Sequence, residues 1–214
     1  MTIKAVIFDF GGVFTTSPVE NFSVYEKAHG LPERFIGEVI KSRINDGAFS
    51  KYERGEINFA AFDTAFAQET RAAGHEISGA QFLEFLKLAP KQNMIDTLHA
   101  VKAAGFKTGC ITNNFPKGQG ASAPLADDYN ALFAQTTKLF DHIIESSKVG
   151  VRKPEPRIYE MMCEALDVAP KQCIFIDDLG VNLKPARAMG MTTIRAPFGD
   201  VTPAINELRR VIAI

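Results

Sequence analysis

The feature that most constrains the fold is a set of five short apolar runs spread along the chain. They occupy residues 5–10, 106–112, 142–144, 173–177 and 192–195. Runs this short and this rich in branched side chains are typical of buried parallel strands. Most of them follow or precede a helical pattern, for example residues 94–104 before the second run and 156–166 before the fourth. This alternation predicts an α/β fold with a doubly wound parallel sheet.

Residues 17–92 break the alternation. They contain no strand-like run but four amphipathic stretches, at residues 21–29, 33–44, 59–73 and 79–88. The segment is too long for a crossover helix and long enough for a small helical bundle. We therefore predict two domains: a core formed by residues 1–16 and 93–214, and an α-helical cap, residues 17–92, inserted after the first strand.

The overall composition excludes several classes of protein. The chain has 214 residues, of which 46% are hydrophobic and 23% charged, with a formal net charge of −1. This balance is that of an ordinary globular protein and offers no electrostatic footprint for nucleic acid or an anionic membrane. No apolar stretch approaches the roughly 18 residues that a membrane span requires, and no signal-peptide pattern is present. We expect neither a nucleic-acid nor a membrane partner, and the sequence sets no oligomeric state.

The cysteines indicate a reducing compartment. The chain has three, and none of them forms a C-x-x-C pair. Cys110 and Cys173 lie inside apolar runs, so we expect buried, reduced thiols. A cytoplasmic enzyme is the resulting expectation.

Asp9 is the first candidate for chemistry. It closes the first apolar run and is followed by Gly11 and Gly12. Open α/β sheets bind ligands at the carboxyl ends of their strands, and glycines let a ligand approach the backbone. Asp9 is therefore a candidate nucleophile or metal ligand, the alternative being a turn residue in Asp-Phe-Gly-Gly.

Polar side chains also follow the other strands. The second run ends at Thr112-Asn113, the third leads to Lys153, and the fourth ends at Asp177-Asp178. Taken singly, Thr112-Asn113 could cap a helix and Lys153 could be a solvated turn residue. The adjacent aspartates repel each other unless a cation offsets them. Because parallel strands end at one edge of the sheet, we predict that these motifs and Asp9 converge.

Phosphoryl transfer is the chemistry that this set fits. A phosphate dianion approaching a carboxylate needs positive charge, which Mg²⁺ and Lys153 supply. Asp9, Asp178 and a backbone carbonyl suit the ligand preferences of Mg²⁺. Thr112 and the N–H of Asn113 would hold the remaining phosphate oxygens at a helix N-terminus.

The combination of these motifs with a helical insertion resembles the haloacid dehalogenase-like (HAD) hydrolase superfamily. Residues 149–159 and 177–187 look most like the phosphatase domain at the N-terminus of soluble epoxide hydrolases. The resemblance covers essentially the whole chain. It implies a Rossmann-like core, a helical cap that closes over the site, and an aspartyl-phosphate intermediate.

The resemblance also implies a role for each site residue. Asp9 would be the nucleophile, and Thr112 and Lys153 would hold the phosphate. Asp178 would bind Mg²⁺ directly, and Asp177 would support Asp178 or bind the metal through water. The substrate would be a small phosphorylated metabolite.

Gly11 departs from the family pattern. In the family's phosphatases this position usually holds a second aspartate, which protonates the leaving alcohol and later activates water. The metal contact there is made by the backbone carbonyl, so Gly11 is still an expected metal ligand. The lost acid–base side chain is typically worth about 10²–10⁴-fold in rate. That loss matters most for alkoxide leaving groups and least for acyl phosphates or sugar-1-phosphates. We therefore expect a slow or leaving-group-selective phosphatase, or a proton donor from the cap or from water.

Two alternatives stay open. The superfamily's metal-independent 2-haloacid dehalogenases also lack the second aspartate and use an aspartate nucleophile, but Asp177-Asp178 has little purpose without a cation. The second alternative is a non-catalytic module that binds a phosphorylated ligand. The presence of Asp9, Thr112, Lys153 and both aspartates argues against it.

Overall fold

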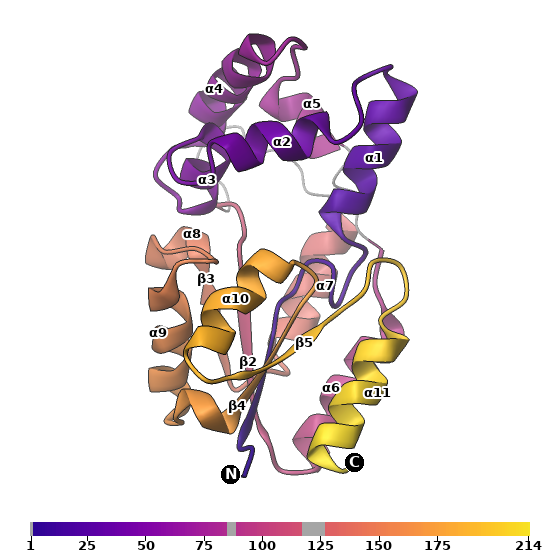
Figure 1. Ribbon diagram of the computed structural model, residues 1–214, viewed down its shortest axis with the longest axis vertical. Helices are drawn as coiled ribbons and strands as arrows, with labels where there is room; N and C mark the ends of the chain where they lie inside the picture. Colours follow the sequence, from indigo (N-terminus) through magenta and orange to yellow (C-terminus); the bar gives the residue numbers. More distant parts are fainter. Residues whose placement is uncertain (1, 85–88, 117–126) are drawn as a thin grey trace.

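A parallel five-stranded sheet forms the centre of the computed structural model, which describes residues 2–84, 89–116 and 127–214 (Figure 1). The strands are β1 (Ala5–Phe8), β2 (Lys107–Thr112), β3 (His142–Glu145), β4 (Cys173–Asp177) and β5 (Thr192–Arg195). Their order is β3-β2-β1-β4-β5, and each neighbouring pair is parallel. The predicted Rossmann-like α/β fold is confirmed, with β1 two residues shorter than its apolar run.

Helices cover both faces of the sheet, as the figure shows (Figure 1). On one face, Val6 and Phe8 belong to a cluster with α6 (Gln92–Ala103), α7 (Asp127–Thr137) and α11 (Thr202–Ile212). On the other, Ala5 and Ile7 pack with α9 (Pro156–Leu166) and α10 (Gly180–Ala188). Successive side chains of a strand point to opposite faces, so a strand covered on both sides needs an unbroken apolar run. Two short elements complete the core, α8 (Ser146–Val149) after β3 and η1 (Pro170–Gln172) before β4.

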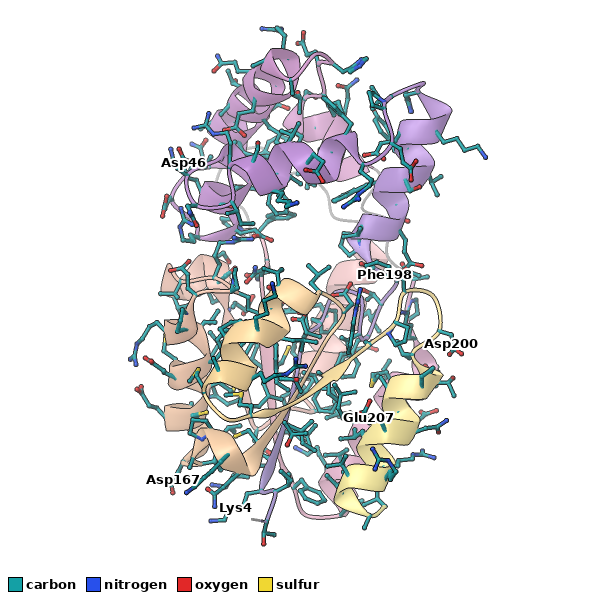
Figure 2. The ribbon with its side chains drawn as sticks, in the orientation of Figure 1. Lys4, Asp46, Asp167, Phe198, Asp200 and Glu207 are labelled. Atoms are coloured by element: carbon teal, nitrogen blue, oxygen red, sulfur yellow. The ribbon has the colours of Figure 1, made fainter. Side chains whose placement is uncertain are left out.

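Five helices between β1 and α6 form a separate layer beyond the carboxyl ends of the strands (Figure 1). They are α1 (Pro18–Ala28), α2 (Phe35–Ser42), α3 (Ala48–Glu53), α4 (Phe59–Ala72) and α5 (Gly79–Glu84). They bury a hydrophobic cluster of their own: Phe22, Phe35, Ile36, Val39, Ala48, Tyr52, Phe62, Phe66, Ile77, Phe82 and Leu83. In Figure 2 the labelled Asp46 belongs to this layer, whereas Lys4 and Asp167 mark the opposite end of the core. We propose that residues 17–92 form a cap domain.

Four of these helices correspond to the four amphipathic stretches of the sequence. The end of the last stretch, residues 85–88, lies outside the described residues. The fifth helix, α3, was not predicted. Its six residues span less than two turns, which is too short for a helical period to stand out.

The two chain segments that join the cap to the core run side by side. Thr15 forms an antiparallel bridge with Pro90. The amide of Thr16 donates to the carbonyl of Ala89 at 2.9 Å, and the amide of Lys91 donates to that of Phe14 at 2.8 Å. The connection to the cap therefore lies only a few residues after Asp9.

Other expectations concern cysteines and membranes. Cys110 and Cys173 are buried and free, as predicted, and so is Cys163. Within the described ranges, no helix has both the length and the apolar character needed to cross a bilayer.

A close contact between α4 and α5 gives a test of the cap. A Cβ at Gly79 would lie 2.7 Å from the Cα of Asp63. Because the backbone of a packed helix yields little, we expect Gly79→Ala to lower the free energy of unfolding by about 1–3 kcal/mol, measured by urea denaturation. Gly37→Ala in α2 is the control, since a Cβ there meets nothing within 4 Å. It should be neutral or stabilising by up to about 1 kcal/mol, and equal losses in both variants would contradict this packing.

Candidate active site

A buried lysine joins two aspartates at the carboxyl edge of the sheet. Lys153 Nζ lies 2.6 Å from Asp9 Oδ1 and 2.8 Å from Asp177 Oδ2. Asp9 directly follows β1 and Asp177 ends β4, and these two strands are neighbours. The ammonium also lies 5.7 Å from the centroid of the Phe175 ring, and the lysine side chain is only 1% exposed. The structure thus brings Asp9, Lys153 and Asp177 into contact, as the sequence predicted.

Asp178 completes a cluster of three buried carboxylates. Oxygen atoms of Asp9, Asp177 and Asp178 all lie within 4.8 Å of one another. Ser17 Oγ donates to Asp178 Oδ2 at 2.6 Å. A Cβ at Gly12, where φ is +80°, would overlap the same carboxylate, so this turn needs a glycine. In the part of the chain that the structure describes, Asp178 has no ion-pair partner within 4.0 Å.

Burial shifts the protonation of these groups. It raises the pKa of Asp9 well above its ordinary value, although Lys153 opposes the shift. Burial, together with the neighbouring charge of Asp177, raises the pKa of Asp178 to about 6. Burial alone would lower the pKa of Lys153, but Asp177 and Asp9 outweigh it and raise the pKa above its ordinary value. The lysine is therefore charged, and its single ammonium is the one positive side chain in contact with the cluster of three carboxylates among the described residues.

This donor set fits a divalent cation such as Mg²⁺. The ion prefers carboxylate oxygens, and the excess negative charge is buried where water cannot offset it. Asp9 and Asp178 are the side chains best placed to hold it. The carboxylate of Asp177 is engaged already: it accepts from Asn182 Nδ2 at 3.0 and 3.1 Å and from the Leu179 amide at 2.8 Å, besides its contact with Lys153. Asp177 is thus arranged to support the cluster.

Gly11 lies in the turn after β1. A Cβ there would meet only Pro18 Cδ, at 3.9 Å. Among the described residues, nothing crowds a Cβ at this position, so a side chain can begin here without a backbone shift.

Thr112 and Asn113 lie at the end of β2, next to β1. Thr112 is buried and paired with Glu145 of β3. Asn113 holds the main chain of Lys153 from both sides: Oδ1 accepts from the Lys153 amide at 2.8 Å, and Nδ2 donates to the Lys153 carbonyl at 3.0 Å. The expected helix N-terminus is wrong for the described residues, because 113–116 are not helical and α7 begins at Asp127. Residues 117–126 lie outside the described part.

Three further residues at the site were not predicted. Asn182 of α10 contacts Asp177, and Ser17 contacts Asp178. Lys91 is buried and its Nζ donates to the Gly12 carbonyl at 3.0 Å, with burial lowering its pKa. Ser17 carried a signal for a helix start, since Glu20 completes a capping box with it. No local pattern indicates a contact with a carboxylate 161 residues away.

Residues 3–190 match the haloacid dehalogenase-like hydrolase family. The chain belongs to this family. It is 29% identical over 226 residues to bifunctional epoxide hydrolase 2 of Sus scrofa, covering 100% of this chain and 40% of that protein. The chain thus spans about two fifths of the length of that relative. It is 28% identical over 214 residues to a sesquiterpene phosphatase of Aspergillus oryzae, covering 99% of this chain and 97% of that protein. The predicted family, and the resemblance to soluble epoxide hydrolases, are confirmed.

Solved structures share the fold of this HAD-like hydrolase. A HAD family enzyme from Bacteroides thetaiotaomicron, in complex with magnesium and inorganic phosphate, is similar with a TM-score of 0.60 and 21% identity, over 92% of this chain and 96% of that chain. The L-2-haloacid dehalogenase from Xanthobacter autotrophicus is similar with a TM-score of 0.59 and 22% identity, over 99% and 83%. The fold alone therefore does not distinguish a phosphatase from a dehalogenase.

The raised pKa of Asp178 predicts a pH dependence of stability. Its pKa is about 6 in the folded protein against an ordinary value of 3.8. Between these values the folded state holds a proton that the unfolded state has lost, so stability falls as pH rises through about 6. We expect Asp178→Asn to remove this loss and to stabilise the metal-free protein at pH 8, by on the order of 3 kcal/mol at most, and by less at pH 5.

Urea denaturation in EDTA at the two pH values measures the effect. Asp96→Asn, an exposed carboxylate of α6, is the control and should keep the wild-type slope. A variant at Asp178 with the same slope as the wild type would show that this carboxyl is not the group that titrates.

Proposed function

We propose that this HAD-like hydrolase is a Mg²⁺-dependent phosphatase that acts on a small phosphorylated metabolite through an aspartyl-phosphate at Asp9. The observation that carries the proposal is the cluster of three buried carboxylates, only two of which contact the buried ammonium of Lys153. Such an excess of buried negative charge is costly without a further cation. A phosphatase uses that cation, whereas a metal-independent dehalogenase has no use for it.

The contacts of Asp9 favour one of its oxygens for attack. Lys153 Nζ and the Phe10 amide both contact Oδ1, each at 2.6 Å. These two donors fix the carboxylate and leave Oδ2 as the oxygen that we assign to attack on phosphorus. The O–P bond to Asp9 forms as the bond to the leaving oxygen breaks, and that oxygen takes the electron pair.

The phosphate would be held by residues at the end of β2 and by a residue of the loop that follows α8. Lys153 would offset the charge of the phosphate. The hydroxyl of Thr112 and the main-chain amide of Asn113 are the proposed contacts for the other phosphate oxygens. Bound Mg²⁺, held by Asp9, Asp178 and the Gly11 carbonyl, would supply further positive charge against the phosphate. Asn113 keeps Lys153 in place by holding its main chain.

Proton transfer is the step for which Gly11 provides no group. Protonation of the leaving oxygen then falls to water or to a side chain of the cap. Leaving groups that are stable as anions need this proton least, so acyl phosphates and sugar-1-phosphates are the preferred substrates in this proposal.

Metal-independent dehalogenation is the second candidate, because Gly11 and the shared fold suit it equally well. A phospho-ligand-binding module is the third.

A screen of sugar, acyl, alkyl and lipid phosphates separates these three functions. We expect phosphate release with Mg²⁺, its loss in EDTA, and a fall of about 10³-fold or more in Asp9→Asn with an unchanged circular dichroism spectrum. Halide release from 2-haloacids in EDTA would contradict the phosphatase, and binding of phosphate esters without turnover would favour the module.

The role of Gly11 has its own test. Because a Cβ at this position would come no closer than 3.9 Å to any neighbour among the described residues, Gly11→Asp should fold and restore an acid–base group. We expect it to raise the rate on alkyl phosphates by up to about 10²-fold and to change the rate on acyl phosphates much less. Gly11→Asn has a side chain of matched size that cannot donate and accept a proton as a carboxyl does, so it should not raise the rate on either substrate class. An equal gain on both substrate classes would disprove the leaving-group argument.

A further inference from the structure

The C-terminal end of α3 in the cap is bound to the core at two points. The guanidinium of Arg152 contacts Glu53 Oε2 through Nε at 2.7 Å and through Nη2 at 2.5 Å. The main-chain carbonyl of Glu53 accepts from Ser146 Oγ at 2.6 Å. Both side chains of the ion pair are buried, each 7% exposed. We call Glu53, Arg152 and Ser146 the latch.

Arg152 belongs to the loop that presents a proposed site residue, and Ser146, the first residue of α8, contacts another such loop. Arg152 immediately precedes Lys153, whose ammonium contacts Asp9. Ser146 Oγ accepts from the amide of Asn114 at 3.0 Å, next to Asn113. One residue of the cap is therefore linked to both loops that would hold the phosphate.

The cap and core backbones approach closely beside the latch. A Cβ at Gly55 would lie 2.5 Å from the carbonyl oxygen of Ser147, so only a glycine permits this contact. Arg152 also donates through Nη1 to the carbonyl of Ile44, in the cap, at 3.3 Å. Among the described residues, the guanidinium contacts of Arg152 are all with the cap, through Glu53 and Ile44.

The energetics of the latch favour the closed arrangement. If α3 moves away from the core, the buried ion pair of Arg152 with Glu53 and the hydrogen bond of Ser146 to the Glu53 carbonyl are both lost. Movement is needed during turnover, because Asp9, Lys153 and Asp178 are buried in this arrangement. Because Asn113 holds the main chain of Lys153 in the core, movement of the cap is the motion that would expose these residues.

We propose that Glu53 is a positioning residue that stabilises the closed cap through Arg152 and Ser146. Its kinetic consequence rests on the proposed phosphatase function, whereas its structural consequence does not. Loss of the carboxylate lowers the closed fraction in the free protein. Apparent affinity for substrate falls in proportion to that fraction, while saturating substrate still drives closure.

Three variants test the latch. Glu53→Ala removes the carboxylate, and Glu53→Gln keeps the size and one acceptor. Glu56→Ala is the matched control, because Glu56 pairs with Arg54 at 2.5 Å inside the cap, three residues further along the chain. Amide hydrogen exchange of the segments 107–116 and 146–152, followed by mass spectrometry, reports opening without any need for turnover.

We expect Glu53→Ala to speed exchange in both segments by about 10-fold and to raise KM by a similar factor, with kcat within about 3-fold of the wild type. Glu53→Gln should lie between Glu53→Ala and the wild type, and Glu56→Ala should match the wild type. A folded Glu53→Ala protein with wild-type exchange would overturn the proposal. A fall in kcat at unchanged KM would also overturn it, because that is the result of a smaller active fraction.

Two further outcomes are covered by the design. If Glu53→Ala does not fold, Ser146→Ala removes the second contact without leaving a buried charge, and it should speed exchange in the same segments; wild-type exchange there would overturn the latch. If the wild type releases no phosphate, the proposed function fails, and the exchange measurements still decide whether the latch holds the cap.

Discussion

The ammonium of Lys153, held between Asp9 and Asp177, is the interaction on which the rest of the structure depends. It joins the ends of two neighbouring strands to the loop that follows α8, and its contacts are 2.6 and 2.8 Å. Parallel pairing of β1 with β4 brings the two carboxylates close, and Asn113 at the end of β2 fixes the lysine main chain. The central strands of the sheet thus serve to assemble one charged group and its partners.

The charge of this group sets the chemistry. One ammonium offsets only part of the charge of three buried carboxylates, and burial together with the charge of Asp177 raises the pKa of Asp178. A divalent cation and a phosphate can share such a site, because each supplies the charge that the other needs. Asp178 also accepts a hydrogen bond from Ser17, so the same cluster contacts the N-cap residue of α1, the first helix of the cap. The phosphate-holding loops contact the cap at the other end, through Glu53.

Much of the fold and the centre of the site could be predicted from the sequence. The runs that became β4 and β5 were predicted with their observed ends. All residues of β4 are buried, and a strand buried on both faces leaves a clear apolar signal. Asp9, Lys153, Asp177 and Asp178 could be placed together because parallel strands end at one edge. The helix α3 was too short to show a period. The contacts Ser17–Asp178 and Glu53–Arg152 join residues 161 and 99 positions apart, and no local pattern encodes them. The helix expected directly after Thr112 is wrong for residues 113–116, because a polar pair after a strand also suits a loop that holds another loop.

The proposed function depends on transfer of the phosphoryl group to Asp9. Rapid quenching in acid during turnover of an acyl phosphate with Mg²⁺, followed by mass spectrometry of the proteolysed protein, tests it most directly. We expect a transient phosphoryl adduct on the peptide that contains Asp9, formed at the rate of turnover and absent from Asp9→Asn. Phosphate release with no adduct at any time, or with an adduct on another residue, would contradict it.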